Sequence, residues 1–492
     1  MKKIFTYMAL VAVAVLTACS DSDIADISTG TAAPSEYSNV NSIVMPTMTH
    51  EEGWENAPAV FSKSTYDYDY TAGKMAFSWT VGDNVGVYPI KYMEGGIQKT
   101  RSADDSTVQE WRINQVQNSG NNSFGIFDSD DAHISTHYGE SYIAVYPYIV
   151  DDTDYRDIPI TYEGQLQTES PKIGCYVNRA TPEKLTAYVN SEKAACEHLT
   201  PYDYMVDKER LANEIGGKIR FQMKRLGATV RFYMVAPENI VFDSLQLYNP
   251  AASFVKQTTL DASQERFVDP TKTSHVMSLQ LNRFGFDYTT RTANDDYYYN
   301  ASIGWIMIGY MMVAPIDLSG ESTPMSTLYL IGREPLCYTT VDEYNTAWGT
   351  SIEAPEFAAL TTADKIKLYD NVNDYNADNH KSLSAGEFDA LSKEKKMMIY
   401  PDVEAFNAAK GTTLSAAEFA TLTIGQKITR YTRKVFKADN LANKNIQADI
   451  MYQWAVRGAT EDAPITFQEI SIENWTPGSE FTNADGNGTE DW

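Results

Sequence analysis

Three consecutive copies of a 31-residue pattern run from Val341 to Thr432 without a gap, and they constrain the fold of this chain more than any other feature. A repeat of this length is typical of one supersecondary unit that buries its apolar face only against its neighbours. The sequence therefore predicts a stacked array over residues 341–432. The positions that recur in all three copies are Val341, Val372 and Val403; Tyr344, Tyr375 and Phe406; Asn345, Asn376 and Asn407; Phe357, Phe388 and Phe419; Leu360, Leu391 and Leu422; Lys365, Lys396 and Lys427; and Tyr369, Tyr400 and Tyr431.

Each copy of the repeat is predicted to be helical. Ser384 and Glu387 have the spacing of a capping box, in which a hydroxyl and a carboxylate satisfy free amides at a helix start, and Ser415 and Glu418 repeat it. A second helix is expected near Thr361, Ser392 and Thr423. One continuous apolar core is expected from Phe357, Phe388, Phe419, Leu360, Leu391 and Leu422. Two roles are open for the array, a spacer that lengthens the protein and a recognition surface.

The sequence on both sides of the repeats favours β-structure. Short apolar or alternating runs such as Val85–Tyr88 and Tyr142–Tyr146 are separated by turn-forming stretches, which indicates antiparallel sandwiches. We expect a mainly β protein with two β-sandwiches in series. The first spans residues 42–235, and the second spans 236–340 and 433–480 with the array at 341–432 inserted into it. Residues 481–492 are predicted to be a polar tail, because the sequence from Gly478 to Trp492 is acidic, rich in Gly and Asn, and without a strand pattern.

The first residues resemble a bacterial lipoprotein signal. Lys2 and Lys3 precede an apolar run from Ile4 to Leu16, and small residues lead to Cys19. This pattern predicts a signal peptide at 1–18, acylation of Cys19 by diacylglycerol and palmitate, and a flexible tether at 19–41. Acidic residues directly after Cys19 favour export to the outer surface of the cell outer membrane. The alternatives are an ordinary cleaved signal and a solvated linker.

Composition and motifs exclude several classes of function. The formal net charge of -26 argues against nucleic acid, which requires a basic face. The three cysteines left after lipidation, Cys175, Cys196 and Cys337, have no metal-binding spacing, and no cofactor is expected. The chain has no Gly-x-Ser-x-Gly, His-Glu-x-x-His or phosphate-binding glycine motif, so we do not expect an enzyme.

Two stretches of the sequence are weakly similar to metal-binding motifs. His133 and His137 could share a zinc ion on a helix, but their neighbours favour a strand, where four residues span about 13 Å. Asn483, Asp485, Asn487 and Gly488 are similar to the start of a calcium loop that lacks its closing glutamate. We therefore expect no metal site.

Four further stretches together resemble the fimbrillin-like family of lipoprotein pilus subunits. They are Trp79–Tyr88, Ala144–Tyr148 with Ile158–Ile160 and Gln165, Tyr204–Val206 with Ile219–Phe232, and Ile470–Trp475. The resemblance implies two transthyretin-like β-sandwich domains and assembly with other pilus subunits by β-strand exchange. It also implies a surface-exposed fimbrium with a role in cell adhesion. The helical array is not part of the family pattern.

The chain departs from the pattern of stalk subunits in that family. Some of these are matured by an arginine-specific cut ahead of the first domain, but the first arginine here, Arg101, already lies inside it. Lys63 is the only lysine between the tether and Lys74, so another protease or no cleavage has to be considered. Because the tail is a poor donor strand, we expect an accessory, anchor or tip subunit. Its adhesion partner would be a host or bacterial surface protein or glycan.

An alternative hypothesis is that the chain is a glycan-binding surface lipoprotein of a polysaccharide uptake system. The chain contains 32 Tyr, and aromatic faces of this kind could stack on sugars. The fate of the segment from Ser42 to Met75 separates the two readings, because strand exchange requires a core strand there that can be replaced.

Overall fold

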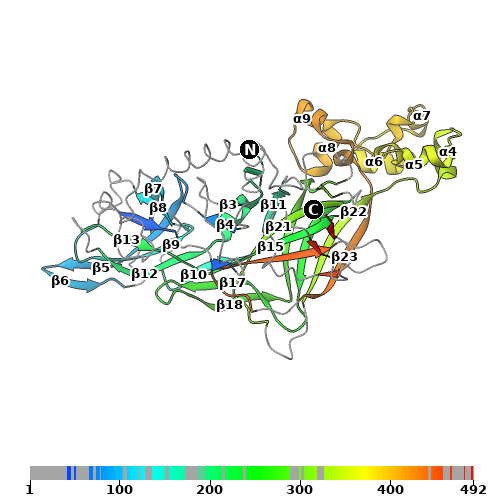
Figure 1. The fold of residues 1–492 in the computed structure, drawn as a ribbon. Coiled ribbons are helices and arrows are strands. Elements are labelled where there is room, and N and C mark those ends of the chain that lie inside the picture. The colour runs from blue at the N-terminus through cyan, green and yellow to red at the C-terminus, as the bar shows by residue number, and fades with distance from the viewer. Residues whose placement is uncertain are drawn as a thin grey trace, which may run out of the picture.

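The structure is a computed structural model, and the helical array projects from one end of a body built of β-sheets (Figure 1). It describes residues 41–45, 49–50, 66–69, 74–77, 79–102, 108–119, 122–127, 136–149, 154–171, 187, 190–191, 194–212, 217–236, 240–288, 299–300, 304–318, 326–441, 445–457, 466–467, 481–482 and 489–490. The mainly β fold class predicted from the sequence is confirmed. Within these residues no helix is long and apolar enough to span a membrane.

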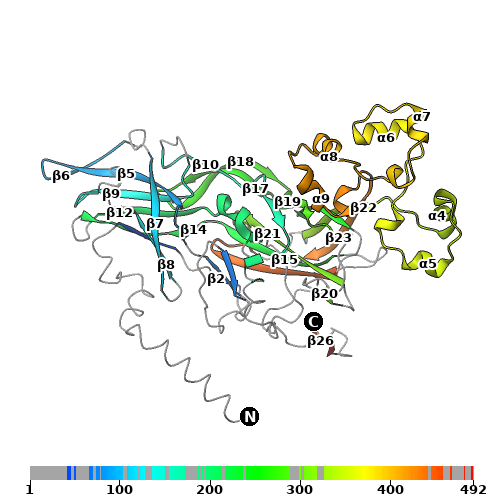
Figure 2. The same ribbon diagram turned by 90° about the horizontal axis from the view of Figure 1, so that it is seen from above.

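A nine-stranded sheet lies at the end of the body farthest from the helices (Figure 2). It curls on itself, so that Trp111 packs against Phe127, Phe221 and Tyr142 at ring-centroid distances of 5.2, 5.9 and 6.0 Å. The strands in order are β13 (Arg220–Gln222), β1 (Ser42–Val44), β8 (Asn122–Phe127), β7 (Gln109–Ser119), β5 (Asn84–Glu94), β9 (Ser141–Tyr146), β12 (Met205–Leu211) and β14 (Lys224–Arg225), with β6 (Ile97–Thr100) paired to β5.

Three further sheets form the part of the body next to the helices. One contains β11 (Leu166–Glu169), β19 (Val276–Gly285), β16 (Val241–Tyr248), β22 (Ser326–Pro335) and β23 (Tyr431–Leu441). The second contains β2 (Thr49–His50), β24 (Ile450–Arg457), β15 (Ala228–Ala236), β21 (Gly304–Val313) and β20 (Tyr299–Asn300), with β25 (Thr466–Phe467) paired to β24. The third contains β10 (Ile158–Thr161), β17 (Phe254–Asp261) and β18 (Arg266–Ser274).

The predicted boundary at residues 235 and 236 does not coincide with a change of sheet. β15 pairs along its whole length with β21, and β11 pairs in parallel with β19. Both strands precede residue 237, yet they belong to the sheets next to the helices. The reason is physical: alternation of apolar residues marks a strand, but the choice of its partner depends on contacts distant in sequence. One apolar cluster accordingly runs from Ile43 to Tyr452 through both parts of the body.

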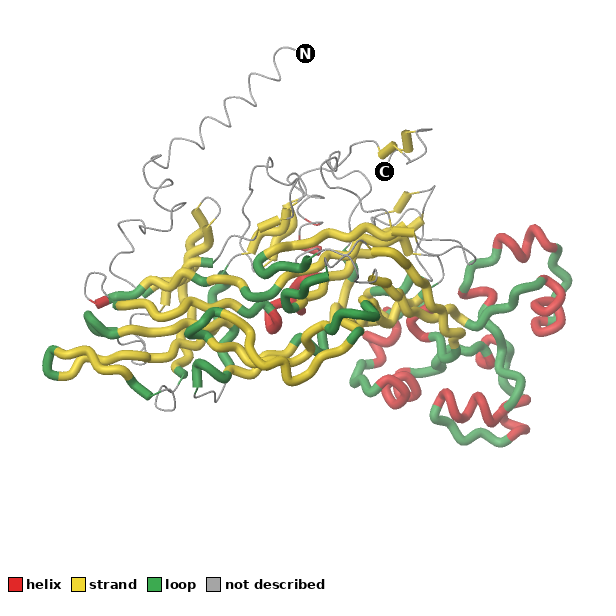
Figure 3. The backbone as a smooth tube through the Cα atoms, turned by 90° about the horizontal axis from the view of Figure 1, so that it is seen from below, coloured by secondary structure: helices red, strands yellow, loops and turns green. Residues whose placement is uncertain are grey.

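The chain between β22 and β23 forms the helical array. Its helices are α4 (Val341–Trp348), α5 (Ala354–Ala359), α6 (Val372–Asn379), α7 (Ala385–Asp389), α8 (Val403–Lys410), α9 (Ala416–Thr421) and α10 (Ile424–Lys427), with 3₁₀ turns η6 (Ala363–Lys365) and η7 (Glu394–Lys396). Figure 3 shows the helical segments joined by loops at the edge of the β-body. Elsewhere, the 3₁₀ helix η4 (Glu197–Tyr202) contacts β21.

Several local expectations for the array can be compared with these helices. The capping boxes at Ser384 and Ser415 are confirmed, since both hydroxyls accept from the amide three residues on. The second helix expected near Thr361, Ser392 and Thr423 is wrong in extent, because only the single turns η6, η7 and α10 form there. The longer partner helix of each unit instead precedes the capping box, behind the N-caps Thr340, Asn371 and Asp402.

The tail also differs from expectation. Residues 481–492 were predicted to lack strands, but β26 (Phe481–Thr482) and β27 (Thr489–Glu490) pair with each other. Two residues on each side are too few to produce an alternating pattern in the sequence. A similar short hairpin, β3 (Tyr66–Asp69) and β4 (Lys74–Phe77), lies in the segment after β2.

Candidate functional sites: the N-terminal strand and the bridge ring

The first of the described strands, β1, lies in the interior of its sheet. It pairs in parallel with β13 and antiparallel with β8, and the side chain of Ile43 is fully buried. The amide of Ser42 donates to Ile219 O at 3.0 Å, and the amide of Met223 donates to Val44 O at 3.2 Å. A Cβ on Gly125 would lie 2.8 Å from Ile43 Cγ2, so the glycine provides the space in which Ile43 sits. Three residues thus complete a sheet whose other strands come from distant parts of the chain.

The residues after β1 connect both parts of the body. Met45 Sδ accepts from Arg225 Nη2 at 3.7 Å, and β2 pairs in parallel with the start of β24. Arg225 is fully buried and binds the two oxygens of Asp203 at 2.6 and 3.1 Å, and Asp449 at 3.1 Å. Burial raises the pKa of Asp449 to about 6, although Arg225 lowers it. A buried ion cluster therefore joins the end of β1, the turn before β12 and the turn before β24.

The repeats are joined by backbone hydrogen bonds between four short extended segments, 336–338, 366–369, 397–400 and 427–430, here called the bridge ring. The amides of Tyr338, Tyr369 and Tyr400 donate to the carbonyls of Lys365, Lys396 and Lys427 at 2.8, 2.7 and 2.8 Å. Antiparallel bridges link Cys337 to Ile366, Leu368 to Met397 and Ile399 to Ile428. The amide of Leu336 donates to Arg430 O at 3.2 Å and closes the ring next to the pairing of β22 with β23.

The expected continuous core of six Phe and Leu side chains is wrong. Each Phe packs against an aromatic ring of its own unit, with centroid distances of 5.7 Å for Tyr344–Phe357, 5.6 Å for Tyr375–Phe388 and 5.5 Å for Phe406–Phe419. Phe388 belongs to a cluster with Ile366, Tyr369, Met398 and Ile428 of the bridge ring, whereas Phe419 and Leu422 belong to a separate one. The period of the sequence therefore reports a repeated unit rather than one shared core.

Two other repeated side chains have local roles. The amide group of Asn345 both donates to Ile352 O and accepts from Ile352 N, at 2.9 and 3.0 Å, and so fixes the loop between the paired helices. Asn376 and Asn407 do the same at Leu383 and Leu414. The Nζ atoms of Lys365, Lys396 and Lys427 lie 4.8, 4.7 and 4.5 Å from the ring centroids of Phe357, Phe388 and Phe419.

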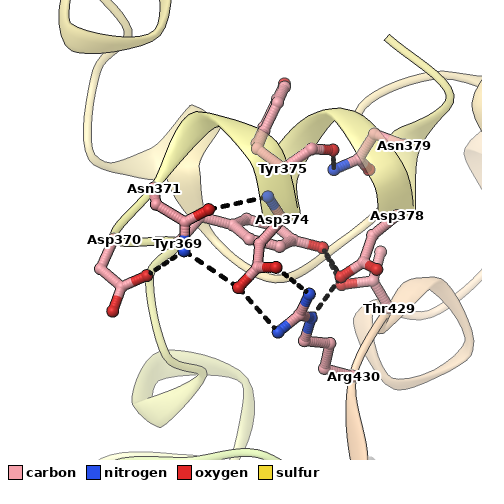
Figure 4. Close-up of polar contacts among 9 residues, drawn as sticks. All are labelled: Tyr369, Asp370, Asn371, Asp374, Tyr375, Asp378, Asn379, Thr429 and Arg430. Atoms are coloured by element: carbon pink, nitrogen blue, oxygen red, sulfur yellow. Dashed lines mark hydrogen bonds and ion pairs between the residues drawn. The ribbon is translucent and has the colours of Figure 1, made fainter. Parts of the chain in front are cut away.

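An ion-pair cluster fixes the end of the array to its middle unit (Figure 4). Arg430, one residue before β23, pairs with Asp378 and with Asp374 of α6, the latter at 3.1 Å. Tyr369 Oη donates to Asp378 Oδ2 at 2.8 Å and lies 2.6 Å from Thr429 Oγ1. A hydrogen bond from Asn371 and the Arg430 guanidinium hold the pKa of Asp374 below its usual value. Burial raises the pKa of Tyr369 well above that of a free tyrosine.

The first repeat leaves half-buried an aromatic position, Tyr344, that the other two repeats bury. Tyr344 and Trp348 stack with centroids 6.0 Å apart and an interplanar angle of 28°, and both are half-buried. The positions equivalent to Tyr344 hold the buried Tyr375 and Phe406. The positions equivalent to Trp348 hold Asn379 and Lys410, so the stacked pair occurs only in the first unit.

The residues singled out from the sequence fall in different places. Cys19, His133, Cys175, Lys63 and the stretch from Asn483 to Gly488 lie outside the described residues. His137 is exposed and lies 3.4 Å from Glu140, and the described part of the chain contains no group of acids, histidines or cysteines able to hold a metal ion. Neither Cys196, which is buried, nor Cys337, which is half-buried, forms a disulfide bond. Arg101 directly follows β6, inside the nine-stranded sheet.

The bridge ring was missed in the sequence, although a signal for it is present. Tyr338 precedes Tyr369, Tyr400 and Tyr431 at the same 31-residue spacing, which marks a fourth copy of the bridge segment ahead of the first helix. The N-caps Thr340, Asn371 and Asp402 form a second overlooked signal for the helices that start at the repeated valines.

Comparison with known proteins identifies structural neighbours only. No protein-family model matches the chain, and no curated protein is similar to it in sequence. A protein proposed to act in cell adhesion from Bacteroides fragilis is similar with 8% identity and a TM-score of 0.31, over 87% of this chain and 97% of the other. The tip fimbrial protein Mfa3 from Porphyromonas gingivalis is similar with 8% identity and a TM-score of 0.25, over 87% and 98%. A proposed cell adhesion protein from Bacteroides uniformis has 12% identity and a TM-score of 0.28, over 56% and 79%.

Proposed function

We propose that this chain is a non-enzymatic, fimbrillin-like surface lipoprotein, an accessory, anchor or tip subunit of a pilus that contributes to adhesion. In this proposal residues 1–18 are removed, Cys19 carries the lipid, and residues 19–41 tether the protein to the outer membrane. Two transthyretin-like sandwiches contact other subunits by strand exchange. The array at 341–432 is an insertion in the second sandwich and carries the recognition surface.

The observation that supports strand exchange is the position of β1. A three-residue strand between β8 and β13 leaves two unpaired strand edges and the empty site of Ile43 if it is withdrawn. Unpaired edges with an apolar slot between them accept an extended peptide from another chain. Because β2 then pairs with β24, withdrawal of the same segment also uncovers an edge in the second sheet.

The position of Arg101 bears on maturation. A cut after Arg101 would separate β5 and β6 from the rest of the nine-stranded sheet, not β1 alone. A cut after Lys63 would leave β1 and β2 held only by pairing and packing. A cut between β2 and β3 would leave the other described strands intact but would break the covalent link to Cys19, so we propose that any maturation there occurs only when the subunit leaves its anchor.

Strand replacement tests this proposal. A protease site introduced between residues 51 and 65 is cleaved in the folded protein, and a fluorescent peptide of residues 41–50 is added in excess. We expect slow incorporation, seen as a rise in fluorescence polarisation, because the peptide re-forms the ladders of β1 and β2. The control peptide carries Ile43→Asp and should not enter, since a carboxylate cannot be buried in the slot beside Gly125. Failure of the native peptide to enter protein from which the segment has been removed would refute a replaceable strand.

A second candidate is glycan binding, and the stacked Tyr344–Trp348 pair favours it. A half-buried aromatic stack offers a flat apolar face to the C–H groups of a sugar. Isothermal titration with a neutral polysaccharide tests it: Trp348→Ala should weaken binding at least tenfold, and Lys410→Ala, at the equivalent position of the third unit, should not. A protein that binds such a polysaccharide but never exchanges β1 would favour this candidate over the pilus subunit.

A further inference from the structure

Exposed apolar side chains gather at the end of the body opposite the helices. Among the described residues, Ile97 is 66% exposed, Tyr138 73%, Leu211 46% and Met93 39%. Gln98 Nε2 donates to Gly139 O at 2.7 Å, and a Cβ on Gly139 would lie 3.0 Å from Met93 Sδ, so the β5–β6 hairpin contacts the loop that carries Tyr138. Gly139 N donates to the carbonyl of Ala212, the neighbour of Leu211. These four side chains are here called the hairpin patch.

The hairpin that carries Met93 and Ile97 contains more basic than acidic residues, although the whole chain has a formal net charge of -26. Residues 84–101 contain Lys91, Lys99 and Arg101 and a single acid, Glu94. Lys99 pairs with Glu94, and Lys91 pairs with Glu209 of β12. The Arg101 guanidinium lies 4.9 Å from the ring centroid of Tyr92. In a lipid surface the acyl chains lie beneath a layer of phosphate groups. Apolar side chains at the end of the hairpin can reach the acyl chains while basic side chains farther along it contact the phosphates.

The chain enters the fold beside this patch. Asn41 Oδ1 accepts from Thr136 Oγ1 at 3.2 Å and from Ile219 N at 3.1 Å. Gly217 is packed so closely on this loop that a Cβ there would lie 2.5 Å from Tyr138 N. Between Cys19 and Asn41 there are 22 peptide steps, which span at most roughly 75 Å. The end of the molecule that receives the N-terminal segment is therefore the end that carries the patch, while the helices lie at the other end (Figures 1 and 2).

We propose that the hairpin patch rests on the lipid surface to which Cys19 is anchored, with Ile97 and Tyr138 entering the boundary between headgroups and acyl chains. This inference rests on the proposed lipidation of Cys19. The anchor holds the patch at high local concentration near the bilayer, so a contact too weak to bind a free protein is populated. The consequence is an oriented molecule, with its helical array directed away from the membrane.

Fluorescence quenching in vesicles tests the orientation. The mature chain carries a hexahistidine tag in place of Cys19 and is held on phosphatidylcholine vesicles by a nickel-chelating lipid, so that the result does not depend on native lipidation. Cys175, Cys196 and Cys337 are replaced by serine, and an NBD fluorophore is placed at Ile97→Cys. The matched control is Val81→Cys. Val81 is 61% exposed and precedes the other end of β5, which is 11 residues or roughly 36 Å long.

We expect NBD at residue 97 to shift to the blue and to be quenched at least twofold by doxyl groups on the acyl chains, and NBD at residue 81 to be unaffected. Equal, water-like emission at both positions would overturn the inference. A blue shift at residue 97 that appears at high protein concentration without lipid would also overturn it, because another subunit would then be the partner. A separate mass measurement of native Cys19 tells whether the proposed anchor itself fails.

Discussion

Replacement of Phe388 by alanine should open the array locally. Its ring is 4% exposed, packs 5.6 Å from Tyr375, and belongs to the cluster that fills the bridge ring. Truncation of a buried phenylalanine costs about 3–5 kcal/mol. The structurally equivalent Phe357 keeps its contacts with Tyr344 and Lys365 but is half-buried, so Phe357→Ala should cost roughly half as much.

Native-state hydrogen exchange of the full chain measures this difference, because it reports the free energy of local opening. In Phe388→Ala the bridge amides of Tyr369, Met398 and Tyr400 should exchange on the order of 100-fold faster or more. The matched control Phe357→Ala should affect these amides far less, and strands β15 and β21 should be unchanged in both. Equal acceleration by the two substitutions would refute the distinction between a central second unit and a peripheral first one.

Three further predictions concern other parts of the chain. Asp449→Asn should change the pH dependence of stability: the folded-state pKa of about 6 lies above the usual 3.8, so protonation favours the folded protein and this contribution is lost as pH rises from about 4 to 6. Denaturation across that range should show that the variant loses less free energy of unfolding than the wild-type chain. The pKa of Asp207 is also raised to about 6, but Asp207 contributes equally to both proteins. An equal loss in both proteins would contradict the assignment to Asp449. Excision of residues 337–429 with a short Gly/Ser bridge should leave β22 and β23 paired, as judged by circular dichroism and cooperative unfolding, because Pro335 already faces Tyr431; loss of folding would mean that the array belongs to the core. Cys19→Ala should abolish incorporation of a palmitate analogue and release the protein from the membrane fraction, and equal labelling of the variant would exclude lipidation at this residue.

The features that the sequence predicts correctly are those that depend on residues close together in the chain. The capping boxes at Ser384 and Ser415 involve residues three apart, and both form as expected. The mainly β class was equally visible in alternating runs such as Tyr142–Tyr146. By contrast, the pairing of β11 with β19 and of β15 with β24 joins segments more than 100 residues apart, and no local pattern encodes it.

At the candidate sites, too, local patterns were visible in the sequence and long-range contacts were not. The sequence indicates that the segment after residue 41 decides between the two candidate functions. Its insertion between β8 and β13, however, depends on the space above Gly125 and is not visible in the sequence. The repeated Asn and Lys positions were recognised as a pattern, whereas their roles as a loop clamp and a ring-stacking cation follow only from the folded unit. The core of the array was misjudged because identical side chains at a fixed period can pack within each unit as well as between units.

Closure of the bridge ring has a mechanical consequence. The array leaves the sheet at Pro335 and returns at Tyr431, and these two residues oppose each other in adjacent strands. A tensile load carried along the sheets is therefore transmitted across the β22–β23 hydrogen bonds without stretching any of the three helical units. Because the helical units lie outside the strands that carry the force, they keep their shape and any bound ligand while the β-sheets are under tension.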